Sequence, residues 1–133
     1  MDEFVLDRTG KAPLKFAGKK IRRSNGRYQN GTEQNRWHVI ELFRAQGGKY
    51  VLAISYRTLW DGESHEHTVA VCESPSAVIH ELESFDPTAP VKAYGSNPAY
   101  AEKNAQLRDG VRMRYATQVS EILEGREFAE TID

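Results

Sequence analysis

Two glycine-containing dipeptides, Gly47-Gly48 and Asp61-Gly62, separate runs of residues that are rich in β-branched and aromatic side chains. Glycine adopts the positive φ angles of tight hairpin turns, so each dipeptide predicts a hairpin between the runs on either side of it. The sequence therefore predicts a four-stranded antiparallel β-meander, whose strands are residues 14–23, 36–44, 49–60 and 63–72.

The Asp61-Gly62 hairpin also predicts a register. A two-residue loop at this position places Trp60 opposite Glu63, Arg57 opposite Glu66 and Tyr56 opposite His67. In this register Ile54 and Leu52 face Val69 and Val71, which gathers the apolar side chains on one face. Because side chains alternate along a strand, a shift of one residue would move this set to the other face.

Helical patterns follow the predicted strands. Ser74-Pro75 is typical of a helix start, because serine caps the first turn and proline lacks an N–H that would have no partner there. Apolar spacing then predicts a helix over residues 74–85 that packs on the sheet, and a helical region from residue 96 to about 125. The predicted fold is α+β, with a loosely ordered arm (1–13), one domain (14–125) and a frayed tail (126–133).

The strand at residues 36–44 carries apolar residues on both faces, with Trp37, Val39 and Phe43 on one and Ile40 and Leu42 on the other. A strand of this kind has both faces covered. The two helical regions are one way to cover them, and a homodimer partner is another.

Composition excludes several classes of protein. The chain of 133 residues has no apolar run of the length a membrane helix needs, and its start has no secretory signal pattern. A single cysteine, Cys72, excludes an intramolecular disulfide. We expect a cytoplasmic protein without membrane contact.

The net charge of -1 hides a local excess of positive charge. Residues 11–36 have a net charge of +7, while residues 1–10 and 37–133 have net charges of -2 and -6. Clustered basic residues next to an aromatic side chain are typical of anion and nucleic-acid binding. The candidate binding residues are Lys19, Lys20, Arg22, Arg23, Arg27 and Tyr28. Charges on an edge strand also discourage aggregation, which explains the pattern without a ligand.

Two histidines offer a different chemistry. His65 and His67 are two residues apart on a predicted strand, so both side chains point to one face, and such a pair can bind a divalent metal if a third ligand is near. This pair is the basis for an alternative prediction, a small metal-dependent or pocket enzyme. No other cofactor is indicated, and a pair of structural histidines is the simpler interpretation.

Aromatic residues on the second and third predicted strands offer a third possibility. Trp37 and Tyr56 are expected in the core, and Trp60, beside the turn, is expected to be partly exposed. Together they suggest a small pocket or the interface of a homodimeric interaction module. From the sequence we predict a small cytoplasmic binding or accessory protein rather than an enzyme, with a polyanion such as nucleic acid as its ligand.

Overall fold

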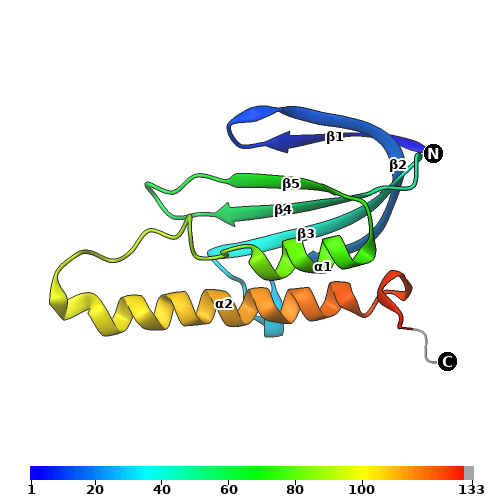
Figure 1. Ribbon diagram of the computed structural model, residues 1–133. Coiled ribbons are helices and arrows are strands. Elements are labelled where there is room, and N and C mark those ends of the chain that lie inside the picture. The colour runs from blue at the N-terminus through cyan, green and yellow to red at the C-terminus, as the bar shows by residue number, and fades with distance from the viewer. Residues whose placement is uncertain (131–133) are drawn as a thin grey trace.

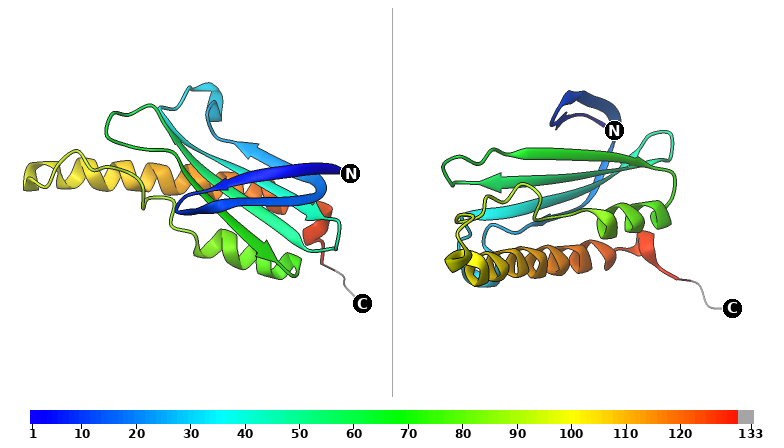
Figure 2. Two further views of the ribbon diagram at one scale, coloured as in Figure 1. Left: turned by 90° about the horizontal axis from the view of Figure 1, so that it is seen from above. Right: turned by 60° about the vertical axis from the view of Figure 1, so that its left-hand side comes forward.

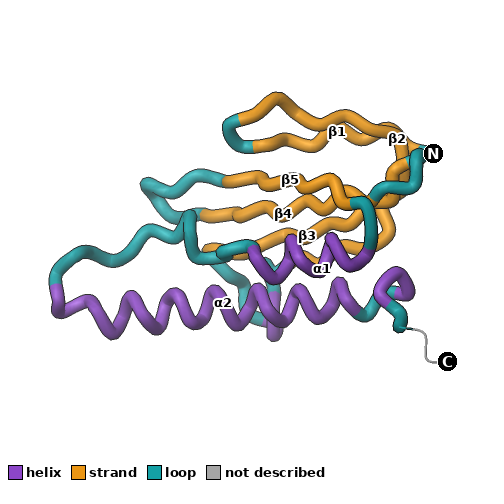
Figure 3. Tube along the Cα trace, viewed as in Figure 1, coloured by secondary structure: helices purple, strands orange, loops and turns teal. Residues whose placement is uncertain are grey.

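The computed structural model describes residues 1–130 and forms one antiparallel sheet with two helices packed on it (Figures 1 and 3). The strands follow one another across the sheet in chain order, so the topology is a meander. Their bounds are β1 (Asp2–Arg8), β2 (Lys11–Asn25), β3 (Arg36–Ala45), β4 (Tyr50–Thr58) and β5 (Glu66–Cys72). The α+β class and the meander predicted from sequence are confirmed.

The sheet has five strands, and the prediction of four was wrong. Residues 2–8, which were expected in a loose arm, form β1 and pair with the first half of β2. Gly10, at φ 77°, supplies the left-handed conformation at the turn between them. Phe4 and Leu6 are half-buried and alternate with exposed residues along β1, which is the period of a strand with one covered face. At the other end, the expected tail includes a short 3-10 helix (Arg126–Phe128), and residues 131–133 lie outside the described range.

The helices begin where the sequence predicts. Helix α1 (Pro75–Ser84) is capped by the Ser74 hydroxyl, which accepts a hydrogen bond of 3.1 Å from the Ala77 N–H. Helix α2 (Ala101–Leu123) runs without a break through Gly110. Figure 2 shows that the N-terminal part of α2 extends beyond the sheet. None of the helices in residues 1–130 is both long enough and apolar enough to cross a membrane.

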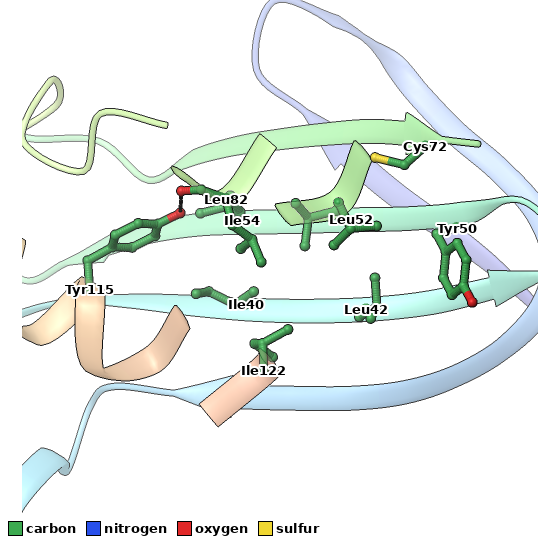
Figure 4. Packing of buried hydrophobic residues seen from close by; sticks show 10 residues of the cluster. Ile40, Leu42, Tyr50, Leu52, Ile54, Cys72, Leu82, Tyr115 and Ile122 are labelled. Atoms are coloured by element: carbon green, nitrogen blue, oxygen red, sulfur yellow. Dashed lines mark hydrogen bonds between the residues drawn. The ribbon is translucent and has the colours of Figure 1, made fainter. Parts of the chain in front are cut away.

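One face of the sheet, which we call the helix face, forms the larger core with α1 and α2 (Figure 4). Leu82 of α1 and Ile122 of α2 are buried against the central strands. The Tyr115 hydroxyl donates a hydrogen bond of 2.7 Å to the Leu82 carbonyl and so ties the two helices together. The strand residues of this core are Ile40, Leu42, Tyr50, Leu52, Ile54 and Cys72.

The opposite face, which we call the concave face, is covered by the sheet itself. The β1–β2 hairpin folds back over it, and at the hairpin turn the Thr9 N–H donates to the His67 carbonyl at 2.9 Å. Phe4, Phe16 and Phe43 form an aromatic cluster underneath, with ring centroids 4.8–5.4 Å apart. The prediction that β3 is covered on both faces is therefore correct. The concave face is covered by the curled β1–β2 hairpin, and not by a helix.

The predicted β4–β5 register was wrong by one residue. Tyr56 lies opposite Glu66 and Ser55 opposite His67, so His67 and Val69 face the concave side. The connection comprises residues 59–65 and is not a two-residue turn, although Gly62 does have a positive φ of 82°. The cause is Glu63, whose carboxylate turns inward and is held by side chains of β3 and β4. The longer loop shifts β5 by one position and moves its side chains to the other face.

Candidate functional site

A β-bulge in β2 determines which of its basic residues lie together. The register shifts between Lys20 and Arg22, so Ile21 has no partner on β3. Lys20 then lies opposite Phe43 and Arg23 opposite Glu41, and both point to the concave face although they are three residues apart. Gly18, which precedes the bulge, is needed for close packing, because a Cβ atom there would clash with the Arg44 carbonyl oxygen.

Lys20 and Arg23 share one carboxylate. The Lys20 Nζ lies 2.6 Å and the Arg23 Nε 3.6 Å from Glu41 Oε2. The side chains of Lys20 and Arg23 are 42% and 49% exposed, whereas that of Glu41 is 21% exposed. Because Lys20 and Arg23 share the single charge of Glu41, one positive charge is uncompensated, and it lies on the two more exposed side chains.

Arg27, in the loop that follows β2, lies against two aromatic rings. Its Cζ lies 4.8 Å from the ring centroid of Trp37 and 5.6 Å from that of Tyr28. Glu33 pairs with Arg27 at 3.0 Å, and Tyr28 is 62% exposed. Trp37 lies opposite Arg57 in the β3–β4 ladder, so these two side chains also point to the concave face. The concave face therefore combines cations with the half-buried ring of Trp37.

Two of the candidate basic residues lie on the other face. Arg22 is opposite Leu42 on the helix face, and its guanidinium donates to the main-chain carbonyl of Glu121 near the end of α2. Ser24 adds a hydrogen bond of 2.6 Å to the Glu121 carboxylate. Lys19 lies opposite Arg44 and is exposed on the helix-face side. Folding thus keeps Lys20 and Arg23 together on Glu41 of the concave face, and Arg27 and Tyr28 lie in the loop that follows β2. Arg22 fastens α2 to the sheet.

The two histidines are engaged separately. His67 Nδ1 lies 3.0 Å from Ser55 Oγ, and His65 Nδ1 accepts a hydrogen bond of 3.3 Å from the Thr58 N–H. In the part of the chain that the structure describes, no group of three or more His, Cys, Asp or Glu side chains is placed to hold a metal ion. The geometry therefore adds no third ligand to the predicted metal pair.

Glu63 is the centre of a buried polar cluster that the sequence did not reveal. Its carboxylate accepts hydrogen bonds from the Tyr56 hydroxyl (2.7 Å), the Thr58 hydroxyl (2.7 Å) and the Lys92 N–H (2.8 Å), and it pairs with Arg36 at 2.9 Å. Burial alone would raise the pKa of Glu63, but these hydrogen bonds outweigh it and lower the pKa to about 2. A carboxylate with this many donors anchors the loop between β4 and β5.

The three aromatic residues predicted to form a pocket or an interface are spread over three environments. Tyr56 is buried on the helix face, and Trp37 lies on the concave face. Trp60 is 42% exposed, as predicted, and stacks on the Arg36 guanidinium with 4.5 Å between Cζ and the ring centroid. No described contact bears on the predicted homodimer, which stays a prediction.

A second buried polar group joins α2 to the sheet. The Gln118 amide, 2% exposed, donates to the carbonyls of Ser24 (3.1 Å) and His38 (2.8 Å). The His38 ring packs among Tyr56, Phe85 and Tyr115. Burial, assisted by the nearby charge of Arg114, lowers the pKa of His38 to about 4. In the sequence, Gln118 and His38 are recognisable only as polar residues within apolar patterns, and such patterns do not identify the groups that they contact.

Comparison with protein-family models, curated proteins and solved structures found no match to this chain.

Proposed function

We propose that the chain is a small cytoplasmic binding protein that holds a single-stranded nucleic acid on the concave face of its sheet. The observation that carries this proposal is that Lys20, Arg23 and Trp37 share the concave face, and that Arg27 from the following loop stacks on Trp37. Cations that follow a phosphate backbone, combined with aromatic side chains on which bases stack, are the two components of single-strand recognition.

The charge balance favours a modest affinity. Lys20, Arg23 and Arg57 face this side and Arg27 lies against Trp37, while Glu33 and Glu41 neutralise part of their charge. Each phosphate contact to a single strand contributes a salt dependence of about -0.7 to the slope of log K against log salt. With two to four contacts we expect a slope between about -1.4 and -2.8.

The test is fluorescence anisotropy of a labelled single strand of about 20 nucleotides at about 50 mM salt, where phosphate contacts are strong. We expect binding that weakens roughly tenfold in the double variant Lys20→Gln/Arg23→Gln, with a salt slope closer to zero by about 1.4. The matched control is Lys15→Gln/Lys19→Gln, which removes the same charge from the same strand on its opposite side.

The control separates a local site from general attraction. If both double variants weaken binding equally, the strand responds to overall charge and the concave-face interface is wrong. If the unmodified protein binds no strand at about 50 mM salt, the proposed function is wrong.

A further inference from the structure

A cavity of about 170 Å³ lies on the concave side, between β1 and β5. The hairpin turn reaches β5 at one point, where the Thr9 hydroxyl accepts a hydrogen bond of 2.8 Å from the His67 N–H. Residues 5–7 of β1 line one side of the cavity and residues 67–69 of β5 another. The interior strands contribute Glu41, Ala53, Ser55 and Arg57.

Arg57 is the main positive group of this cavity. Its Nε is buried and has no hydrogen-bond partner among the described residues. No ion pair found in residues 1–130 involves Arg57. Glu66, the partner expected from sequence, lies opposite Tyr56 and therefore faces the other side of the sheet. A buried hydrogen-bond donor without an acceptor raises the free energy of the folded protein. An anion bound in the cavity would supply that acceptor to the half-buried Arg57 guanidinium, which has no carboxylate partner among the described residues.

Two further donors lie beside Arg57. Ser55 and His67 both line the cavity and contact each other, with 3.0 Å between Oγ and Nδ1. A hydroxyl, an imidazole and a guanidinium are groups that bind the oxygens of a phosphate, and the planar guanidinium can donate two parallel hydrogen bonds.

Two carboxylates also line the cavity. Glu41 is compensated by Lys20 and Arg23. Asp7 is exposed, forms no ion pair in the described part of the chain, and is close enough to His67 to influence its titration. The negative charge of Asp7 therefore repels an anion in the cavity. Removing this charge should strengthen anion binding, whereas removing a cationic side chain should weaken it.

We infer that this cavity is a subsite for a terminal phosphate group, held by Arg57, Ser55 and His67. The inference rests on the proposed function and deepens it, since the cavity opens on the same face as Lys20 and Arg23. The cavity volume of about 170 Å³ lies below the roughly 300 Å³ at which pockets begin to enclose whole small molecules. It accommodates the phosphate end of a strand, while the sugar and base remain outside.

Binding in this subsite is pH-dependent. Burial and the charges of Arg57 and His65 lower the pKa of His67, while Asp7 raises it. A bound phosphate favours the protonated imidazole, so binding raises the pKa of His67. The charged groups facing this histidine are Arg57 on β4, Asp7 on β1, Glu41 on β3 and His65.

The test compares strands that differ only in a 5′-phosphate or a 5′-hydroxyl group. We expect the phosphorylated strand to bind roughly tenfold more tightly. Arg57→Gln removes this preference, Arg57→Lys retains part of it, and Asp7→Asn increases it severalfold. The charge-matched control is Arg108→Gln on the exposed side of α2, which leaves the preference unchanged. A second probe, inorganic phosphate alone, shifts the NMR signals of the His67 ring in the unmodified protein and not in Arg57→Gln.

The outcomes separate the two proposals. Equal affinity for both strands, with binding still sensitive to Lys20 and Arg23, overturns the phosphate subsite and leaves the strand interface standing. A response of His67 to inorganic phosphate without binding of either strand supports the subsite and overturns the proposed function. If Arg57→Gln and Arg57→Lys both keep the full preference, the phosphate lies elsewhere.

Discussion

Glu63 shows how one side chain decides the placement of a whole strand. Its carboxylate is 1% exposed and accepts hydrogen bonds from β4, from the Arg36 side chain of β3 and from the Lys92 main chain. The sequence places Glu63 directly after Asp61-Gly62, where an exposed residue is the natural expectation. Burial of this carboxylate depends on Arg36, 27 positions earlier, which local sequence patterns do not reveal.

We expect Glu63→Gln to destabilise the fold by about 3–5 kcal/mol, because it leaves the buried Arg36 guanidinium without a counter-ion. Urea unfolding at neutral pH measures the change. Glu66→Gln, an exposed carboxylate on the same side of the hairpin, is the control and should change the stability by less than about 0.5 kcal/mol. A loss below about 1 kcal/mol for Glu63→Gln would show that the cluster does not hold the loop.

Glu63 also predicts acid sensitivity. Its folded-state pKa of about 2 lies below its ordinary value of 4.5, so the unfolded chain takes up the proton first as the pH falls. Its contribution to stability is complete above about pH 4.5 and is lost between about pH 4.5 and 2.

His38 acts in a higher pH range. Its folded-state pKa of about 4 lies below 6.5, so its contribution is complete above about pH 6.5 and is lost as the pH falls to about 4. We expect a loss of up to about 3 kcal/mol in this range. His38→Phe keeps an aromatic ring there and should flatten the profile between pH 6.5 and 4, whereas the exposed His80→Gln should not. Equal slopes for all three proteins would contradict this role of His38.

At the scale of elements, the sequence predicted helix starts and strand positions better than register. Ser74 and the Gly47-Gly48 turn act through neighbouring residues: Ser74 caps α1 as predicted, and the predicted hairpin forms, although only Gly48 has a positive φ. The β4–β5 register depends on loop length, and loop length depends on the distant contacts of Glu63. The bulge at Ile21 likewise depends on how β2 packs on β3. These two features decide which charged residues share the concave face, so the composition of the candidate site could not be predicted.

Helix α2 offers a test of its continuity through Gly110. Glycine weakens a helix interior by roughly 1 kcal/mol relative to alanine. A Cβ atom at Gly110 would lie 3.2 Å from the terminal nitrogen of the flexible Arg114 side chain, which can move away. We expect Gly110→Ala to stabilise the protein by about 0.5–1 kcal/mol in urea unfolding. A loss of stability would mean that the Arg114 side chain cannot move away from the added methyl group.

At the scale of the whole molecule, the curl of the sheet creates the candidate site. The sequence predicted that both faces of β3 are covered, and the residues on each face were correctly assigned. It did not predict that the first strands fold over one of them, because β1 was expected as an arm. The curl places a polar cavity next to Lys20 and Arg23. The charge segregation seen in the sequence is thus only partly preserved in space, since Arg22 and Lys19 lie on the other side.

The central claim is that a single strand lies on the concave face, and NMR mapping tests it most directly. A short single-stranded oligonucleotide is titrated into ¹⁵N-labelled protein while backbone amide and indole signals are followed. We expect the largest shifts at Lys20, Arg23, Arg57 and the Trp37 indole, with little change at Lys15, Lys19 or α1. Shifts concentrated on the helix face, or none at about 50 mM salt, would contradict the account.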